Sequence, residues 1–84
     1  MAQKAIHERD DVNADSGEQE YGEVEFADPV NNKYPIDTEK HVRAAWSYIH
    51  QADNAAKYKK HEVELIKSRI VKAAKRFDIN IEAD

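Results

Sequence analysis

The chain contains no cysteine, so neither a disulfide framework nor a thiolate zinc site can supplement a small hydrophobic core. It has only two glycines and two prolines, too few glycines for a loop that cradles phosphate groups. No apolar run approaches the roughly 18 to 20 residues that cross a membrane, and the first residues lack the apolar centre of a signal peptide. With 84 residues, we expect one small, soluble, cytoplasmic domain with no membrane partner.

Residues that usually carry catalysis or bind metals are scattered along the chain. His41 and His50 are nine positions apart and face opposite sides of a predicted helix, while His7 and His61 lie on other segments. The serines have no histidine and acid at a spacing that suggests a catalytic triad. We therefore expect no catalytic residue, no cofactor and no metal, and predict that the protein is not an enzyme.

Charge divides the chain into an acidic first part and a basic second part. Residues 1–37 contain ten acidic and three basic side chains, whereas residues 38–79 contain ten basic and five acidic ones. Within the acidic part, residues 1–20 include only two sizeable aliphatic side chains, Ile6 and Val12. Such a segment buries too little apolar area to offset the entropy lost on ordering, so we predict a disordered acidic tail over residues 1–20.

Residues 21–80 are predicted to form the folded domain, followed by a C-terminal tail over residues 81–84. The segment "YGEVEF" places its apolar side chains on one face of an extended chain, "ADPVNNK" is typical of a turn, and "KYPI" is a second extended piece. These pieces predict a short β-hairpin or two extended arms, which must pack on helices to be stable.

Two amphipathic helices are predicted to follow. Thr38 is a suitable N-cap for the first, which we expect to end near Asn54. The second runs from about Lys60 to Phe77, because its apolar residues recur at intervals of three and four. The predicted fold is thus mainly α, with the extended pieces packed on an antiparallel two-helix hairpin. The expected core consists of Phe26, Tyr34, Ile36, Val42, Ala45, Trp46, Ile49, Val63, Ile66, Ile70, Ala73, Phe77 and Ile79.

The two ends of the second helix carry different signals. Its start has no Ser, Thr, Asn or Asp as a cap and is rich in lysine, so we expect the first turn to fray. At its end, Asp78 is expected to adopt the left-handed conformation that glycine usually supplies. Ile79 would then fold back onto the last turn.

The outward face of the second helix is the strongest candidate for a binding surface. Basic side chains gather there, as they do on surfaces that contact phosphate groups, although solvent-exposed helix faces are often basic for no functional reason. A leucine off the apolar stripe and a tyrosine on the flank of the first helix are candidate partner contacts. The predicted surface consists of Leu65, Arg69, Lys72, Lys75, Arg76 and Tyr48.

The stretch "FADP…KYPIDTEKHVRAAWSYIHQ…NAAKY…HEVELIKSRIVKAAKRFDI", over residues 26–79, resembles a small uncharacterised domain family of bacteria and their phages. The resemblance implies a shared fold and no particular activity. Family members usually have a capped start to the second helix where this chain has Lys59 and Lys60, and glycine where it has Asp78. Both departures predict looser helix ends.

These features predict a small non-enzymatic interaction module that binds a protein partner, and the resemblance implies a phage-derived setting for it. The alternative is weak nucleic-acid binding through the basic helix face, with the acidic tail lowering the affinity by competing for that face. Two other functions stay open. In the first, the chain self-associates, and we expect a monomer or a weak homodimer. In the second, the acidic arm mimics DNA.

Overall fold

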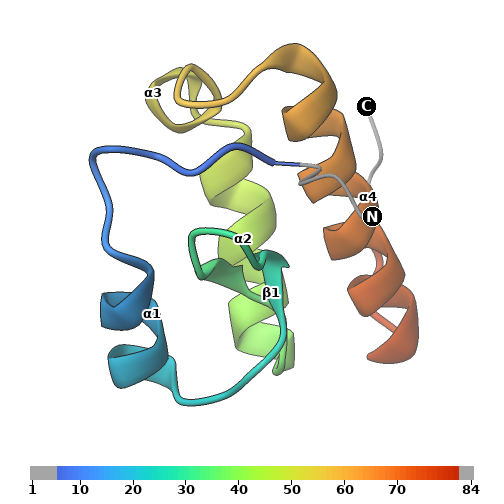
Figure 1. Ribbon diagram of the computed structural model, residues 1–84. Helices are drawn as coiled ribbons and strands as arrows, with labels where there is room; N and C mark the ends of the chain where they lie inside the picture. Colours follow the sequence, from blue (N-terminus) through green and yellow to red (C-terminus); the bar gives the residue numbers. More distant parts are fainter. Residues whose placement is uncertain (1–5, 82–84) are drawn as a thin grey trace, which may run out of the picture.

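The computed structural model describes residues 6–81, and helices make up most of this part, as predicted (Figure 1). The elements in chain order are α1 (Ala14–Tyr21), β1 (Phe26–Asp28), β2 (Lys33–Pro35), α2 (Glu39–Ile49), α3 (Ala52–Ala55) and α4 (Lys60–Arg76). Figure 1 shows α2 between α1 on one side and α4 on the other. α2 contacts both α4 and β2, and β1 contacts α4. None of these helices is long and apolar enough to cross a bilayer.

The two extended pieces pair as an antiparallel hairpin in which Phe26 faces Pro35 across the strands. Asp28 shapes the turn, since one carboxylate oxygen accepts hydrogen bonds from the backbone N–H groups of Val30 and Asn31, each at 3.1 Å. In β2, Tyr34 has a φ of 63°, which a bulky residue keeps only where its surroundings hold it. The ring of Tyr34 is buried in the core, and this packing keeps the residue in the left-handed conformation.

α2 begins where the sequence predicts and ends earlier. The Thr38 side chain accepts a hydrogen bond from the N–H of His41 at 3.0 Å, which confirms the predicted cap. The helix stops at Ile49 instead of near Asn54, because the chain turns extended at Gln51 and starts the separate short helix α3. The Asn54 side chain donates to the carbonyl of Tyr48 at 3.0 Å and so satisfies part of the open end of α2.

The C-terminal end of α4 follows the predicted left-handed cap. Asp78 has a φ of 57°, and the N–H of Ile79 donates to the carbonyl of Ala74 at 2.8 Å. Ile79 is thereby buried, whereas Phe77, which the sequence places in the core, is 38% exposed. The reversal of the chain at Asp78 explains the burial of Ile79, because it folds this residue back onto the last turn of α4.

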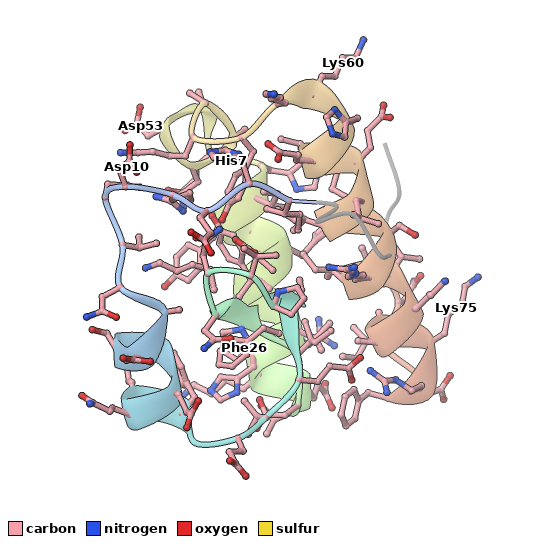
Figure 2. The ribbon with its side chains drawn as sticks, viewed as in Figure 1. His7, Asp10, Phe26, Asp53, Lys60 and Lys75 are labelled. Carbon is pink, nitrogen blue, oxygen red and sulfur yellow. The ribbon has the colours of Figure 1, made fainter. Side chains whose placement is uncertain are left out.

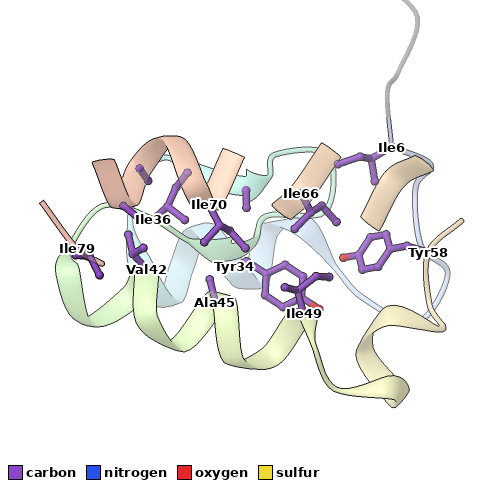
Figure 3. Packing of buried hydrophobic residues seen from close by; sticks show 13 residues of the cluster. Ile6, Tyr34, Ile36, Val42, Ala45, Ile49, Tyr58, Ile66, Ile70 and Ile79 are labelled. Atoms are coloured by element: carbon purple, nitrogen blue, oxygen red, sulfur yellow. The ribbon is translucent and has the colours of Figure 1, made fainter. Parts of the chain in front are cut away.

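The core lies between α2, α4 and the hairpin (Figure 3). Ten of the predicted core residues are buried, while Trp46 and Val63 are partly buried against them. Figure 3 shows Ile6 and Tyr58 near Ile66 at one end of the cluster and Ile79 at the other. The apolar residues buried in addition to the predicted ones are Ile6, Ala27, Tyr58 and Ala74.

Residues 6–20 differ from the predicted disordered tail, of which residues 1–5 lie outside the described part. Ile6 is fully buried, and the chain then crosses the molecule from the side of α4 to α1 (Figure 1). α1 is capped by the side chain of Asn13 and packs against the hairpin turn, where a Cβ on Gly17 would collide with the carbonyl of Asn32. Near the other end, Ile81 is partly buried against the core. Composition missed these contacts because most of them are polar and long-range.

Candidate functional site

Residues 6–13, called the N-terminal strap below, tie the start of the chain to the start of α4. The backbone N–H of His7 donates to Glu62 at 2.7 Å, and the His7 ring nitrogen Nδ1 lies 2.9 Å from the same carboxylate. Glu62 also accepts a hydrogen bond from the N–H of Lys59 at 2.6 Å. Figure 2 shows His7 on the strap beside the first turn of α4.

Glu62 therefore caps α4 from inside its first turn, which differs from the frayed start expected from the sequence. Its side chain is almost entirely buried. Burial alone would raise the pKa of this carboxyl, but hydrogen bonds from Lys59 and His7 outweigh that effect and lower the pKa to about 2. A glutamate three residues into a helix is a known capping signal, so this contact was readable from the sequence in part.

A second set of buried hydrogen bonds joins the strap to the hairpin turn. Asp28 is fully buried, and its second carboxylate oxygen accepts hydrogen bonds from the Tyr58 hydroxyl at 2.7 Å and the Asn31 side chain at 2.9 Å. Asn31 also binds the strap, since it donates to the carbonyl of His7 and accepts from the N–H of Arg9. These polar groups satisfy one another, so the strap is part of the fold.

Arg9 connects this buried set to the surface. Its guanidinium donates to the Tyr58 hydroxyl at 3.0 Å and forms a two-pronged pair with Asp11, at 2.9 and 2.6 Å. The hydrogen bonds from Arg9 hold the pKa of Asp11 well below its usual range. Burial and the hydrogen bond to Asp28 raise the pKa of Tyr58. Arg9 is thus a positioned cation at the edge of a groove.

This groove, called the tyrosine groove below, has a volume of about 470 Å³ and is the candidate binding site. Its size falls within the range of roughly 300 to 1,000 Å³ that is typical of ligand pockets. It is bounded by the strap, the end of α1, β2, α2 and the turn that leads into α3. Its main lining residues are the cations Arg9, Lys33 and Lys40, the tyrosines Tyr21, Tyr34 and Tyr48, and His41.

The tyrosines give the groove an aromatic wall. Tyr48 is 50% and Tyr21 is 37% exposed, whereas Tyr34 is buried beneath them as part of the core. The Tyr21 ring makes edge contacts with Phe26 and with His41, at centroid distances of 6.1 and 5.4 Å. Burial raises the pKa of Tyr21 and of Tyr34, so both hydroxyls stay neutral at physiological pH.

His41 is oriented by an acidic neighbour. Its Nδ1 lies 2.6 Å from a carboxylate oxygen of Asp37. Because an ionised carboxylate only accepts hydrogen bonds, this ring nitrogen is the one that carries the N–H and donates a hydrogen bond to Asp37. The groove has no Ser, Thr or Cys among its lining residues that could serve as a nucleophile beside this pair. Among residues 6–81, no cluster of three or more His, Cys, Asp or Glu side chains could hold a metal ion.

The structure divides the predicted binding surface between two faces. Tyr48 lines the tyrosine groove, whereas Arg69, Lys72 and Arg76 line a separate hollow of about 270 Å³ on α4, together with Glu25. Leu65 is partly buried against the core and so is not a free surface contact. Sequence periodicity missed the tyrosine groove because its walls come from five separate segments.

The basic face of α4, formed by Arg69, Lys72, Lys75 and Arg76, is partly used by the fold. Arg69 donates to the carbonyl of Ala27 at 3.0 Å and so holds β1 against the helix. Arg76 forms an ion pair with Glu25 at 2.7 Å, and both side chains are about half exposed. Lys72 and Lys75 form no ion pair with other described residues, and Figure 2 shows Lys75 pointing away from the body of the protein.

A comparison with family sequence profiles matches nearly the whole chain, residues 2–84, to a family of unknown function, DUF6582. The chain belongs to this family. This confirms the expected membership of an uncharacterised family of small domains. Comparisons with curated proteins and with solved structures give no significant match.

The DUF6582 match extends the family domain beyond the resemblance over residues 26–79. It includes the strap and α1, which supply Arg9 and Tyr21 to the tyrosine groove. The segment that composition separates as a tail therefore belongs to the region that defines the family.

Proposed function

We propose that the protein is a small non-enzymatic interaction module whose tyrosine groove binds a segment of a protein partner. One observation carries this proposal: the tyrosine groove joins two exposed tyrosines with three basic side chains. Tyrosine offers a large, rigid contact area with a polar end, and both tyrosine and arginine are enriched at protein interfaces. The hollow on α4 that Arg69, Lys72 and Arg76 line has no tyrosine and is smaller, about 270 Å³.

The way the groove is built also supports binding of a partner. Tyr21 is held by its ring contacts with Phe26 and His41, and Arg9 is held by Asp11 and Tyr58. Side chains that are already positioned lose less conformational entropy when a ligand binds. We propose that α2 and α4 act as an antiparallel helix hairpin that supports this rigid site. A monomer or a weak homodimer in the cytoplasm, of phage-derived origin, fits this role.

The experiment that tests the proposed function is a peptide-display selection against the immobilised full chain. Selected peptides should bind the wild type and lose binding to Tyr48→Ser, while Phe77→Ser leaves binding unchanged. Both side chains are partly exposed aromatics, but only Tyr48 lines the groove. The proposal fails if no peptide is selected, or if the selected peptides bind both variants equally.

Nucleic-acid binding through the basic face of α4 is the second candidate. The observation that favours it is the pair of exposed lysines, Lys72 and Lys75, which form no ion pair with other described residues. A steep loss of DNA affinity with rising salt, abolished in a Lys72→Gln/Lys75→Gln variant, supports this function. A salt-insensitive or absent interaction removes it.

Deleting residues 1–20 is a poor test of competition by the acidic segment, because it removes Ile6 from the core and His7 from Glu62. Neutralising Glu18 and Glu20 as Glu18→Gln/Glu20→Gln keeps these contacts. If the acidic segment competes for the basic face, this double variant binds DNA more tightly than the wild type. Equal affinity rules the competition out.

A further inference from the structure

We infer that the segment bound in the tyrosine groove is acidic: a short stretch of a protein partner in which carboxylates stand next to an aromatic or aliphatic side chain. This inference rests on the proposed function and adds the chemistry of the partner. It is carried by the distribution of charge around the groove, by the aromatic side chains in it, and by the acidic surface of α1 beside it.

None of the residues that line the groove is acidic, although the protein is rich in Asp and Glu. The chain has 17 Asp and Glu residues among 84, yet the twelve residues that line the groove include none, while they include three Lys or Arg residues. The whole protein has a formal net charge of −4, so this recess is a local reversal of sign. A recess lined by one sign of charge attracts ligands of the opposite sign.

Two of the cations have no partner of their own among the described residues. The charge of Arg9 is offset by Asp11, and the Nδ1 atom of the His41 ring is hydrogen-bonded to Asp37. Lys33 and Lys40 form no ion pair within residues 6–81, so their charges are available to a ligand.

Lys40 lies in the first turn of α2, where a cation is unfavourable for the helix dipole. This placement gives α2 no stability, and it adds to the positive potential of the backbone N–H groups at the start of the helix. Lys33, on β2, contributes to the same groove from the hairpin. A carboxylate bound between these two elements would be attracted by both lysine charges.

The aromatic wall specifies what should accompany the carboxylates. Tyr21 and Tyr48 expose ring surface to the groove, and Ala44 and Pro35 add smaller apolar contacts. An aromatic or aliphatic side chain of the ligand would bury this surface against the rings. Gln51 and Asn54, at the start of α3 and within it, form one end of the groove. The Asn54 amide nitrogen already donates to Tyr48 and Gln51, so the amide nitrogen of Gln51 and the amide oxygen of Asn54 are the atoms suited to bind peptide groups.

The surface beside the groove favours a short acidic peptide over a nucleic-acid strand. α1 carries Asp15, Glu18 and Glu20, all exposed, and no Lys or Arg. A nucleic-acid strand has a negative charge at every nucleotide, so a strand that continued from the groove along α1 would meet repulsion. A peptide confines its charge to a few residues and leaves the groove without this penalty.

The test measures binding of defined probes to the full chain by fluorescence anisotropy. The probes are a labelled peptide of Glu, Asp and Phe, the same peptide with every Glu and Asp replaced by Gln and Asn, and an oligothymidine of equal charge. The acidic peptide should bind about tenfold more tightly than its neutral analogue, because each ion pair with an exposed lysine contributes a factor of about 2 to 5.

Variants assign the effect to the groove. Lys33→Gln/Lys40→Gln should lose about tenfold in affinity for the acidic peptide, by the same factor of about 2 to 5 for each lysine. The charge-matched control Lys59→Gln/Lys60→Gln, at the start of α4 and outside the groove, should bind like the wild type. Equal loss in both double variants would mean that net charge alone is responsible, and would overturn the inference.

The remaining outcomes separate this inference from the proposed function. If the neutral peptide binds as tightly as the acidic one, and Tyr48→Ser weakens both, the acidic chemistry is contradicted while the proposed function stands. If oligothymidine binds more tightly than the acidic peptide, the inference is also contradicted. If display selection yields no peptide that depends on Tyr48, the proposed function fails, and the inference fails with it.

Discussion

The backbone N–H of His7 donates a hydrogen bond to the carboxylate of Glu62, which is 2.7 Å away and 55 residues later in the chain. The same carboxylate accepts a hydrogen bond from the N–H of Lys59 at the start of α4. One buried side chain thus fixes both the strap and the first turn of the longest helix. Since the strap continues into Arg9, the shape of the tyrosine groove depends on this contact.

Replacing this carboxylate should destabilise the whole domain. In Glu62→Gln, one acceptor oxygen becomes an amide group that faces the donors of His7 or Lys59, so we expect a loss of about 1 to 3 kcal/mol in the free energy of unfolding. Urea denaturation measures this loss. The control is Glu64→Gln on the same helix, whose side chain is exposed and which should unfold like the wild type. Equal stability of Glu62→Gln and Glu64→Gln would contradict the capping role.

The same contact predicts a dependence of stability on pH. Hydrogen bonds lower the pKa of Glu62 from 4.5 to about 2 against the opposing effect of burial. Because the pKa is lower in the folded state, the contribution of Glu62 is complete above pH 4.5 and is lost as the pH falls towards 2. The difference in unfolding free energy between wild type and Glu62→Gln should therefore shrink over this range. A difference that stays constant would show that Glu62 is not the titrating group.

Tyr58 is predicted to stabilise the fold through its hydroxyl, which donates to buried Asp28 and accepts from Arg9. Tyr58→Phe keeps the ring in the core but leaves the Asp28 oxygen short of a donor, so we expect a loss of about 1 to 3 kcal/mol. Tyr48→Phe, which removes a hydroxyl from a half-exposed ring, should change stability little. Thermal unfolding of both variants makes this comparison. Equal melting temperatures would rule out a structural role for the buried hydroxyl.

Gly17 is expected to be required for α1 to pack on the hairpin turn. A methyl group there would meet the carbonyl of Asn32, a backbone atom that cannot move aside cheaply. Gly17→Ala should therefore cost about 1 to 3 kcal/mol, although alanine favours helix formation. Ser16→Ala, at an exposed position of the same helix, should be neutral or slightly stabilising. A stabilised Gly17→Ala variant would show that α1 does not approach the turn as closely as described.

Local patterns predicted the parts of the fold that rest on local physics. The apolar intervals of three and four residues in α4 correctly placed Ile66, Ile70 and Ala73 in the core. The predicted helix caps at Thr38 and Asp78 were correct for the same reason, since a helix cap depends on a side chain or a backbone angle within a few residues. Periodicity and capping are properties of short segments, so they can be read from one sequence.

Long-range polar contacts could not be read in this way. Ile6 is followed by a run of polar residues, and hydrogen bonds of His7 to Glu62 and of Arg9 to Asn31 hold this part of the chain where Ile6 enters the core. Composition predicts disorder for such a segment because it counts apolar area and ignores the hydrogen bonds of neighbouring residues. The tyrosine groove was missed similarly: of its lining residues, only Tyr48 was predicted to contact a partner, on the flank of a helix.

The most direct test of the central claim, that the tyrosine groove binds an acidic segment, is amide chemical-shift mapping. The isotope-labelled full chain is titrated with the peptide of Glu, Asp and Phe at low and moderate salt. Shifts that saturate and concentrate at Tyr21, Lys33, Lys40 and Tyr48 are the predicted result. Shifts concentrated at Lys72 and Lys75 on α4, or no shifts at low salt, would contradict the claim.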